Sequence, residues 1–143
     1  MRNIPMLLIA AATLTLAATP IAAEGTGGFV FMGLSVSKTV EFSYYYDVCG
    51  DQATGERLRR LAARRLDACE LPTAEKSALR NKTTALSADM RGRIRNCDAD
   101  QSCVLGKRQF CPNINEHRSV IEQDLIAAEG GGAALERVAG ACE

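Results

Sequence analysis

The chain has 143 residues, and its 17 basic and 17 acidic residues give a formal net charge of zero. It has no tryptophan, three tyrosines and four phenylalanines, so its core must be thin and built mainly from leucine, isoleucine, valine and alanine. This length and composition suit one small domain, and no internal repeat is visible.

The first 23 residues have the layout of a secretory signal peptide. Arg2 supplies a positive charge, residues 6–16 are apolar apart from two threonines, and small residues precede Glu24. The apolar run is shorter than the roughly 20 residues that span a bilayer, and no later segment is apolar enough to do so. We therefore expect residues 1–23 to be a signal peptide and residues 24–143 to form one exported domain without a transmembrane segment. The periplasm is the favoured destination, with secretion as the alternative.

All six cysteines lie in this exported part, at Cys49, Cys69, Cys97, Cys103, Cys111 and Cys142. An even number of cysteines in an oxidising compartment predicts three disulfides. A zinc site would need closely spaced cysteine or histidine ligands, whereas here the gaps between cysteines are 19, 27, 5, 7 and 30 residues and the chain has one histidine. We therefore expect disulfides, no metal site and no cofactor.

The positions of the cysteines favour some pairings over others. Successive antiparallel helices would bring Cys49 close to Cys97 and Cys103, and would place Cys69 at the opposite end of the bundle. A helix of about 14 residues spans roughly 20 Å, which is too far for a disulfide between Cys49 and Cys69. We predict that Cys49 pairs with Cys97 or Cys103.

Residues 29–48 permit two interpretations. Apolar side chains at nearly every even position have the period of a β-strand. A helical stripe is also present, formed by Val36, Val40, Tyr44 and Val48. In the helical interpretation, Cys49-Gly50 ends the helix with glycine in the left-handed position. No later segment has a strand pattern, so we favour a helix and keep an extended segment as the alternative.

Helical periodicity dominates the rest of the chain. We expect helices over residues 55–68, 73–96, a short stretch from Asp98 to Cys111, 116–128 and 133–142. Thr73, Asp98 and Asn115 are the expected N-caps, and Pro112 is expected to end the short helix at Cys111. The prediction is an all-α, disulfide-stapled helical bundle in which neighbouring helices run antiparallel.

Two groups of residues are candidate partner surfaces. Tyr44, Tyr45 and Tyr46 are consecutive, so they cannot all face one core, and tyrosine is favoured at interfaces. Packing in the core and at its rim is the alternative for these three residues. Arg57, Arg60 and Arg64 lie on one helix face, within a stretch (residues 56–108) that holds 13 basic and 7 acidic residues.

This basic stretch suits an anionic partner such as lipid headgroups, a polysaccharide or an acidic protein. The alternative is that the arginines form a solvated helix face, partly paired with the acidic ends of the chain. Nucleic acid is not expected, because an exported chain without a basic and aromatic platform is poorly suited to it.

No arrangement of residues indicates catalysis. The chain lacks a serine in a nucleophile-elbow context and a glycine-rich phosphate loop, and its cysteines are expected to be paired. His117 has no obvious catalytic neighbour, although carboxylates far apart in sequence can meet in a fold. We therefore predict no catalytic residues and an exported, non-enzymatic binding protein whose partner is another envelope or secreted protein. A small envelope enzyme is the alternative.

Residues 95–104 read Arg-Asn-Cys-Asp-Ala-Asp-Gln-Ser-Cys-Val, between a long helix and a basic helical stretch. This segment resembles the helix–Cys-loop–helix of the lysozyme-inhibitor-type helical domain of bacterial envelope proteins. The resemblance implies an all-α periplasmic protein that binds and blocks a cell-wall hydrolase. Because lysozyme is basic, the binding face would then come from an acidic end of the chain.

Overall fold

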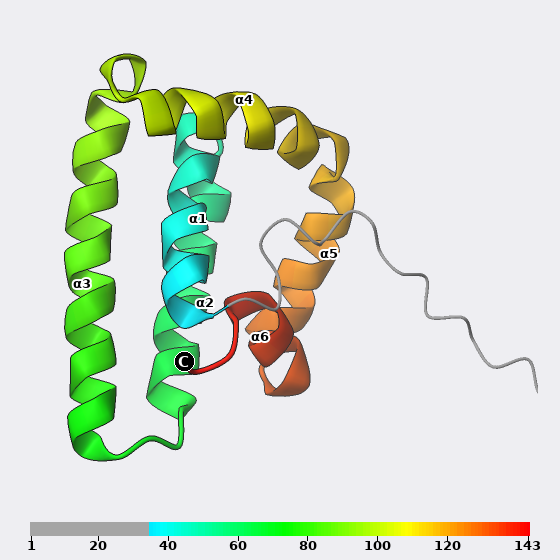
Figure 1. Ribbon diagram of the computed structural model, residues 1–143. Helices are drawn as coiled ribbons and strands as arrows, with labels where there is room; N and C mark the ends of the chain where they lie inside the picture. Colours follow the sequence, from blue (N-terminus) through cyan, green and yellow to red (C-terminus); the bar gives the residue numbers. More distant parts are fainter. Residues whose placement is uncertain (1–34) are drawn as a thin grey trace, which may run out of the picture.

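The computed structural model describes residues 35–143, and the predicted signal peptide and residues 24–34 lie outside this range (Figure 1). Within it the chain forms six α-helices, one 3₁₀ turn and no strand, which confirms the predicted all-α class. The elements are α1 (Val36–Val48), α2 (Gln52–Ala68), α3 (Thr73–Arg95), the 3₁₀ turn (Cys97–Ala99), α4 (Gln101–Glu116), α5 (Arg118–Glu129) and α6 (Gly132–Ala139).

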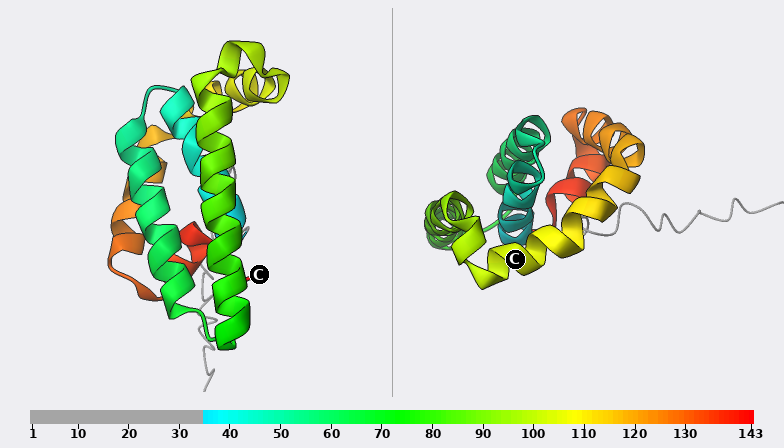
Figure 2. Two further views of the ribbon diagram at one scale, coloured as in Figure 1. Left: turned by 90° about the vertical axis from the view of Figure 1, so that its left-hand side faces the viewer. Right: turned by 90° about the horizontal axis from the view of Figure 1, so that it is seen from above.

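Helix α1 is the central element of the bundle. It contacts α2 along its length, with α3 on one flank and the α5–α6 pair on the other (Figure 1). Seen from above, α4 crosses one end of α1 and connects α3 to α5 (Figure 2). Neighbours on several sides explain why apolar residues of α1 are not confined to one stripe.

Of the two interpretations of residues 29–48, the helix is confirmed for Val36–Val48. Ser35 caps α1 by accepting a hydrogen bond from the Lys38 backbone N–H at 3.2 Å. Gly50 follows the helix with a φ of 85°, as the left-handed position requires. The alternating residues 29–34 lie outside the described part of the chain.

The core consists of two apolar clusters that meet at α1. One joins α1 to α2, α4, α5 and α6, and contains Tyr46, Leu58, Leu61, Ile114, Ile121, Leu125, Ala128, Leu135, Val138 and Ala139. The other lies between α1, α2 and α3, and contains Val36, Val40, Tyr44, Ala62, Leu66, Leu79 and Met90. Helix α3 buries only Leu79 and Met90, so most of this long helix faces solvent.

The start of α4 differs from the prediction at its cap. Asp100, not Asp98, accepts a hydrogen bond from the Cys103 backbone N–H at 2.9 Å and caps α4. Asp98 instead lies in the 3₁₀ turn. Likewise, α3 begins at Thr73 itself, after Pro72, and has no side-chain cap.

The end of α4 also differs, because the helix continues through Pro112 to Glu116. Proline removes one backbone hydrogen bond from a helix, and tertiary packing compensates for the loss here. Ile114, two residues after the proline, is 1% exposed and belongs to the core. Asn115 therefore lies inside α4, and His117 occupies the N-cap position of α5.

The three disulfides pair Cys49 with Cys111, Cys69 with Cys142 and Cys97 with Cys103, at Cα–Cα distances of 5.3, 6.0 and 5.1 Å. The predicted pairing of Cys49 with Cys97 or Cys103 is wrong, whereas the exclusion of Cys49–Cys69 is confirmed. Cys97 and Cys103 pair with each other across the turn between α3 and α4. Because α4 then crosses the end of α1, it brings Cys111 to Cys49 (Figure 1).

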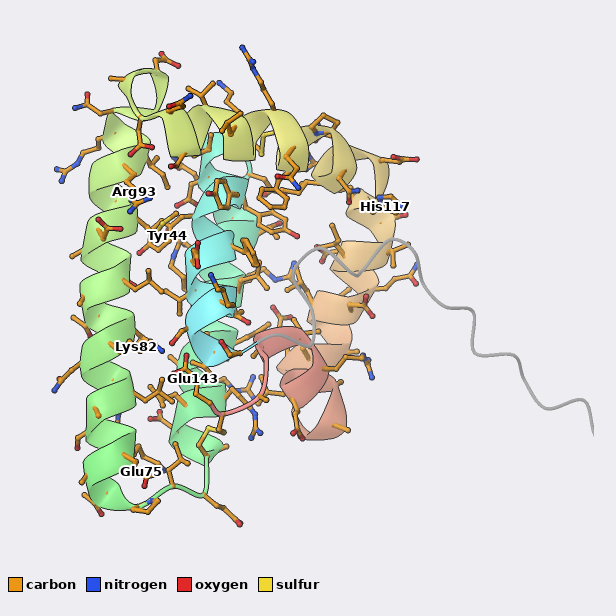
Figure 3. The ribbon with its side chains drawn as sticks, in the orientation of Figure 1. Tyr44, Glu75, Lys82, Arg93, His117 and Glu143 are labelled. Carbon is orange, nitrogen blue, oxygen red and sulfur yellow. A yellow bond between two sulfur atoms is a disulfide. The ribbon has the colours of Figure 1, made fainter. Side chains whose placement is uncertain are left out.

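The last five residues form a C-terminal clamp (residues 139–143) that joins three helices. The carbonyl of Ala139 accepts a hydrogen bond from the Thr39 hydroxyl at 2.9 Å, and that of Ala141 accepts one from the Val36 backbone at 3.0 Å. Glu143 pairs with Lys82 of α3 at 2.6 Å (Figure 3), and this contact lowers the pKa of the Glu143 carboxyl. With the Cys69–Cys142 disulfide, the clamp ties α1, α2 and α3 together.

Candidate interaction surface

Two of the three consecutive tyrosines are core residues. Tyr44 and Tyr46 are 3% and 2% exposed and belong to different apolar clusters, and Tyr44 points from α1 towards α3 (Figure 3). Adjacent residues of a helix point in directions about 100° apart, so a central helix sends them into different parts of the core. Tyr44 and Tyr46 are therefore not available to a partner, and the packing alternative is correct for them.

Tyr45 is half-buried and belongs to an aromatic cluster with Phe42 of α1 and Phe110 of α4. The ring centroids lie 6.1 Å apart for Phe42–Tyr45, 5.4 Å for Phe42–Phe110 and 5.0 Å for Tyr45–Phe110. Burial, and then the negative charge of Glu41, raise the pKa of the Tyr45 phenol. These three residues, here called the aromatic cluster, hold α4 against α1.

The contact between α4 and Tyr45 requires a glycine at position 106. A Cβ atom there would overlap the Tyr45 ring, with Cζ only 2.7 Å away. Gly106→Ala is therefore expected to lower the free energy of unfolding by about 1–2 kcal/mol, because overpacking outweighs the gain in helix propensity. Gly92→Ala, in the last turn of α3 with no atom within 4 Å of the added Cβ, is the matched control.

The control substitution is expected to stabilise the protein by about 1 kcal/mol, the difference in helix propensity between alanine and glycine. Urea denaturation measures the free energy of unfolding of both variants. Effects of the same sign for Gly106→Ala and Gly92→Ala would contradict the close contact with Tyr45.

Two of the three arginines of the predicted face of α2 contact residues of α5. Arg57 donates hydrogen bonds to Glu129 at 2.6 Å and to Glu122 at 2.7 Å, and these bonds raise its pKa while lowering that of Glu129. Arg64 donates to the Glu129 backbone carbonyl at 3.0 Å. Arg60 is exposed and lies 3.7 Å from Glu56 of the same helix. The alternative of a solvated, partly paired face is therefore correct.

The sequence reasoning missed four other cations, which lie in the last two turns of α3 and the first half of α4. Arg91 and Arg95 lie one turn apart near the end of α3, and Lys107 and Arg108 lie on α4. All four are exposed, and none makes an ion pair within residues 35–143. Arg95 and Lys107 line the same pocket, of about 430 Å³, at the junction of the two helices. These residues are called the cationic corner below.

Nearby carboxylates offset part of the charge of this corner. Asp98 lies in the same pocket, and so does Asp47, but Arg59 of α2 already binds Asp47 at 3.0 Å. The Cys97–Cys103 disulfide bridges the turn and fixes the angle between α3 and α4. A rigid surface with an excess of positive charge can bind an anionic partner.

A pocket of about 680 Å³ lies between the start of α2 and the junction of α4 with α5. Ion pairs occupy its rim: Asp51 binds Arg118 at 3.2 Å and Glu122 binds Arg57. His117 is not among its lining residues; its Nδ1 lies 3.0 Å from the Asn113 carbonyl. In the part of the chain described here, no group of three or more histidine, cysteine or acidic residues is placed to hold a metal.

No protein-family model matches the sequence, and no curated protein and no solved structure is significantly similar to it. The resemblance to lysozyme-inhibitor-type domains around Cys97 and Cys103 therefore stays a prediction. Among residues 35–143, no helix is long and apolar enough to cross a membrane.

Proposed function

We propose that this protein is an exported, non-enzymatic binding protein that engages an acidic protein of the bacterial envelope through the cationic corner. The observation that carries this proposal is the contrast between two sets of cations. Four of the five arginines of α2 form ion pairs with carboxylates of α1, α2, α5 or α6, whereas the four cations of the corner are exposed and make no ion pair among the described residues. Their charge is available to a partner.

A protein partner is favoured over a polyanion because an exposed apolar residue lies one helical turn from one of these charges. Leu105 is 56% exposed and lies three residues before Arg108, on the same face of α4. Protein interfaces combine an apolar centre with charged surroundings, and arginine is enriched in them. A site that binds a polyanion by charge alone would gain little from an exposed apolar residue.

Export is supported by the signal-like residues 1–23 and by three disulfides that use all six cysteines. Disulfides persist in oxidising compartments such as the periplasm. They also hold the corner rigidly, so little conformational entropy is lost on binding.

Charge reversal at the corner tests the proposal. The variant R95E/R108E is compared with R60E/R137E, which has the same change in net charge but alters exposed residues of α2 and α6. Immobilised wild-type protein is expected to retain an envelope protein at about 0.1 M salt and to release it near 1 M, where charges are screened. The control variant retains the same protein, and R95E/R108E loses it.

Equal retention by both variants would contradict the proposal, and so would the failure of the wild-type protein to retain any acidic partner. The two alternatives from the sequence stay predictions. Inhibition of a cell-wall hydrolase is tested by adding the purified protein to a lysozyme assay, in which the cationic corner would repel a basic enzyme. For the enzyme alternative, carboxylates such as Asp51 and Glu122 would have to be free to act on a substrate, whereas both are paired with arginines.

A further inference from the structure

The pocket between the start of α2 and the junction of α4 with α5, here called the α2–α5 pocket, has an apolar floor. Tyr46, Ile114 and Ile121 line it, and all three belong to the core. Burial, and then the negative charge of Asp51, raise the pKa of the Tyr46 phenol, so this group is uncharged at neutral pH. The volume of about 680 Å³ lies in the usual range for small-molecule sites, roughly 300–1,000 Å³. The floor therefore suits the hydrocarbon body of a small ligand.

The two cations at the rim of this pocket are already bound to carboxylates of the chain. Arg118 donates a hydrogen bond to Asp51 at 3.2 Å. Arg57 donates to Glu122 at 2.7 Å and to Glu129 at 2.6 Å. An anionic ligand would have to displace one of these carboxylates, so the rim is poorly suited to an anion.

The rim instead has an excess of negative charge. Glu116, the last residue of α4, lines the pocket, is exposed and makes no ion pair among residues 35–143. Arg57 is shared by two carboxylates, so one of their negative charges is also uncompensated. Attraction between opposite charges is stronger at a partly buried site than in bulk water. A ligand with a cationic group therefore matches the charge of the rim.

We propose that the α2–α5 pocket binds a small amphipathic amine, with its hydrocarbon body on the apolar floor and its ammonium group at the rim beside Glu116. The ion pairs Asp51–Arg118 and Arg57–Glu122 hold the start of α2 against α5, so the site is preformed and little conformational entropy is lost on binding. The pocket lies at the α5 end of α4, whereas the cationic corner lies at the α3 end (Figure 1). The two sites can therefore be tested separately.

Nuclear magnetic resonance of isoleucine methyl groups tests the proposal. Among residues 35–143 the isoleucines are Ile114 and Ile121, which line the pocket, and Ile94 and Ile126, which do not. Octylamine is titrated into the purified protein and is expected to shift the methyl signals of Ile114 and Ile121 until they saturate, while those of Ile94 and Ile126 stay in place. Octanoate, which has a similar hydrocarbon body and a carboxylate, is expected to bind about tenfold more weakly.

A pair of variants tests the position of the ammonium group. Glu116→Gln is expected to weaken the binding of octylamine about threefold, as is typical of an exposed charge contact. Glu70→Gln makes the same change in net charge at an exposed residue that does not line the pocket, and is expected to leave binding unchanged. Octanol, which has no charge, is expected to bind both variants equally.

Three results would overturn the proposal. The first is the absence of a saturable shift at Ile114 and Ile121, or an equal shift at the exposed Ile126. The second is equal affinity for octylamine and octanoate, which would show that the charge of the rim has no role. The third is an equal affinity of the Glu116→Gln and Glu70→Gln variants for octylamine.

Discussion

Removal of the Cys69–Cys142 disulfide, in the double variant C69S/C142S, is expected to lower the free energy of unfolding by about 4 kcal/mol. The bond joins residues 73 positions apart, so in the chain-entropy account it strongly restricts the unfolded chain. It also holds the C-terminal clamp against the end of α2. Since small domains are stabilised by only about 5–15 kcal/mol, a loss of this size is a large part of the total.

The double variant C97S/C103S is the control, because this disulfide spans only six positions. The same account predicts a loss of about 2 kcal/mol for it. Urea denaturation without reductant measures both variants. An equal or larger loss for C97S/C103S would show that loop length does not determine the contribution of these disulfides.

Gly140→Ala is expected to lower the free energy of unfolding by about 3 kcal/mol, and two effects combine to produce this loss. Gly140 has a φ of 88°, a conformation that costs an alanine residue roughly 1 kcal/mol. A Cβ atom there would also overlap the backbone of Ser35, with the carbonyl oxygen 2.6 Å away. The substitution would push the C-terminal clamp away from the start of α1.

Gly50→Ala separates the two effects. Gly50 has nearly the same φ, 85°, but no atom lies within 4 Å of an added Cβ. Only the backbone term applies, so the expected loss is about 1 kcal/mol. Thermal denaturation followed by circular dichroism compares the variants, and equal losses at the two positions would contradict the close contact of Gly140 with Ser35.

The helical class was predictable because periodicity and caps act locally. The alternation in residues 29–48 was ambiguous, since α1 has neighbours on several sides and its apolar residues are therefore spread around the helix. The predicted helix end at Cys111 is wrong because the prediction considered only the local tendency of Pro112 to end a helix, and not the tertiary packing of the residues after it. Burial of Ile114 offsets that effect in the folded chain.

Disulfide pairing depends on the direction of α4, which no local pattern specifies. The ends of α1 and α3 do lie close together, as the antiparallel arrangement predicted: Val48 and Cys97 line one pocket. The short connection between Cys97 and Cys103 lets these two pair locally. Cys49 then pairs with Cys111, which lies close to it because α4 crosses the end of α1.

The candidate surface was only partly predictable for a similar reason. A basic stretch is visible in the sequence, but the identity of its free cations depends on where the acidic residues fold. Arg57 meets Glu122 and Glu129, which lie 65 and 72 positions away. Arg95 and Lys107 come together only because the chain turns between α3 and α4.

The central claim is that three disulfides staple an exported helical domain and hold the cationic corner in place. Mapping the disulfides of the purified native protein tests it most directly. Thiol titration of the denatured, unreduced protein is expected to find no free thiol, and digestion without reductant is expected to link Cys49 to Cys111, Cys69 to Cys142 and Cys97 to Cys103. Two or more reactive thiols per chain, or a bond from Cys49 to Cys97 or Cys103, would contradict the account.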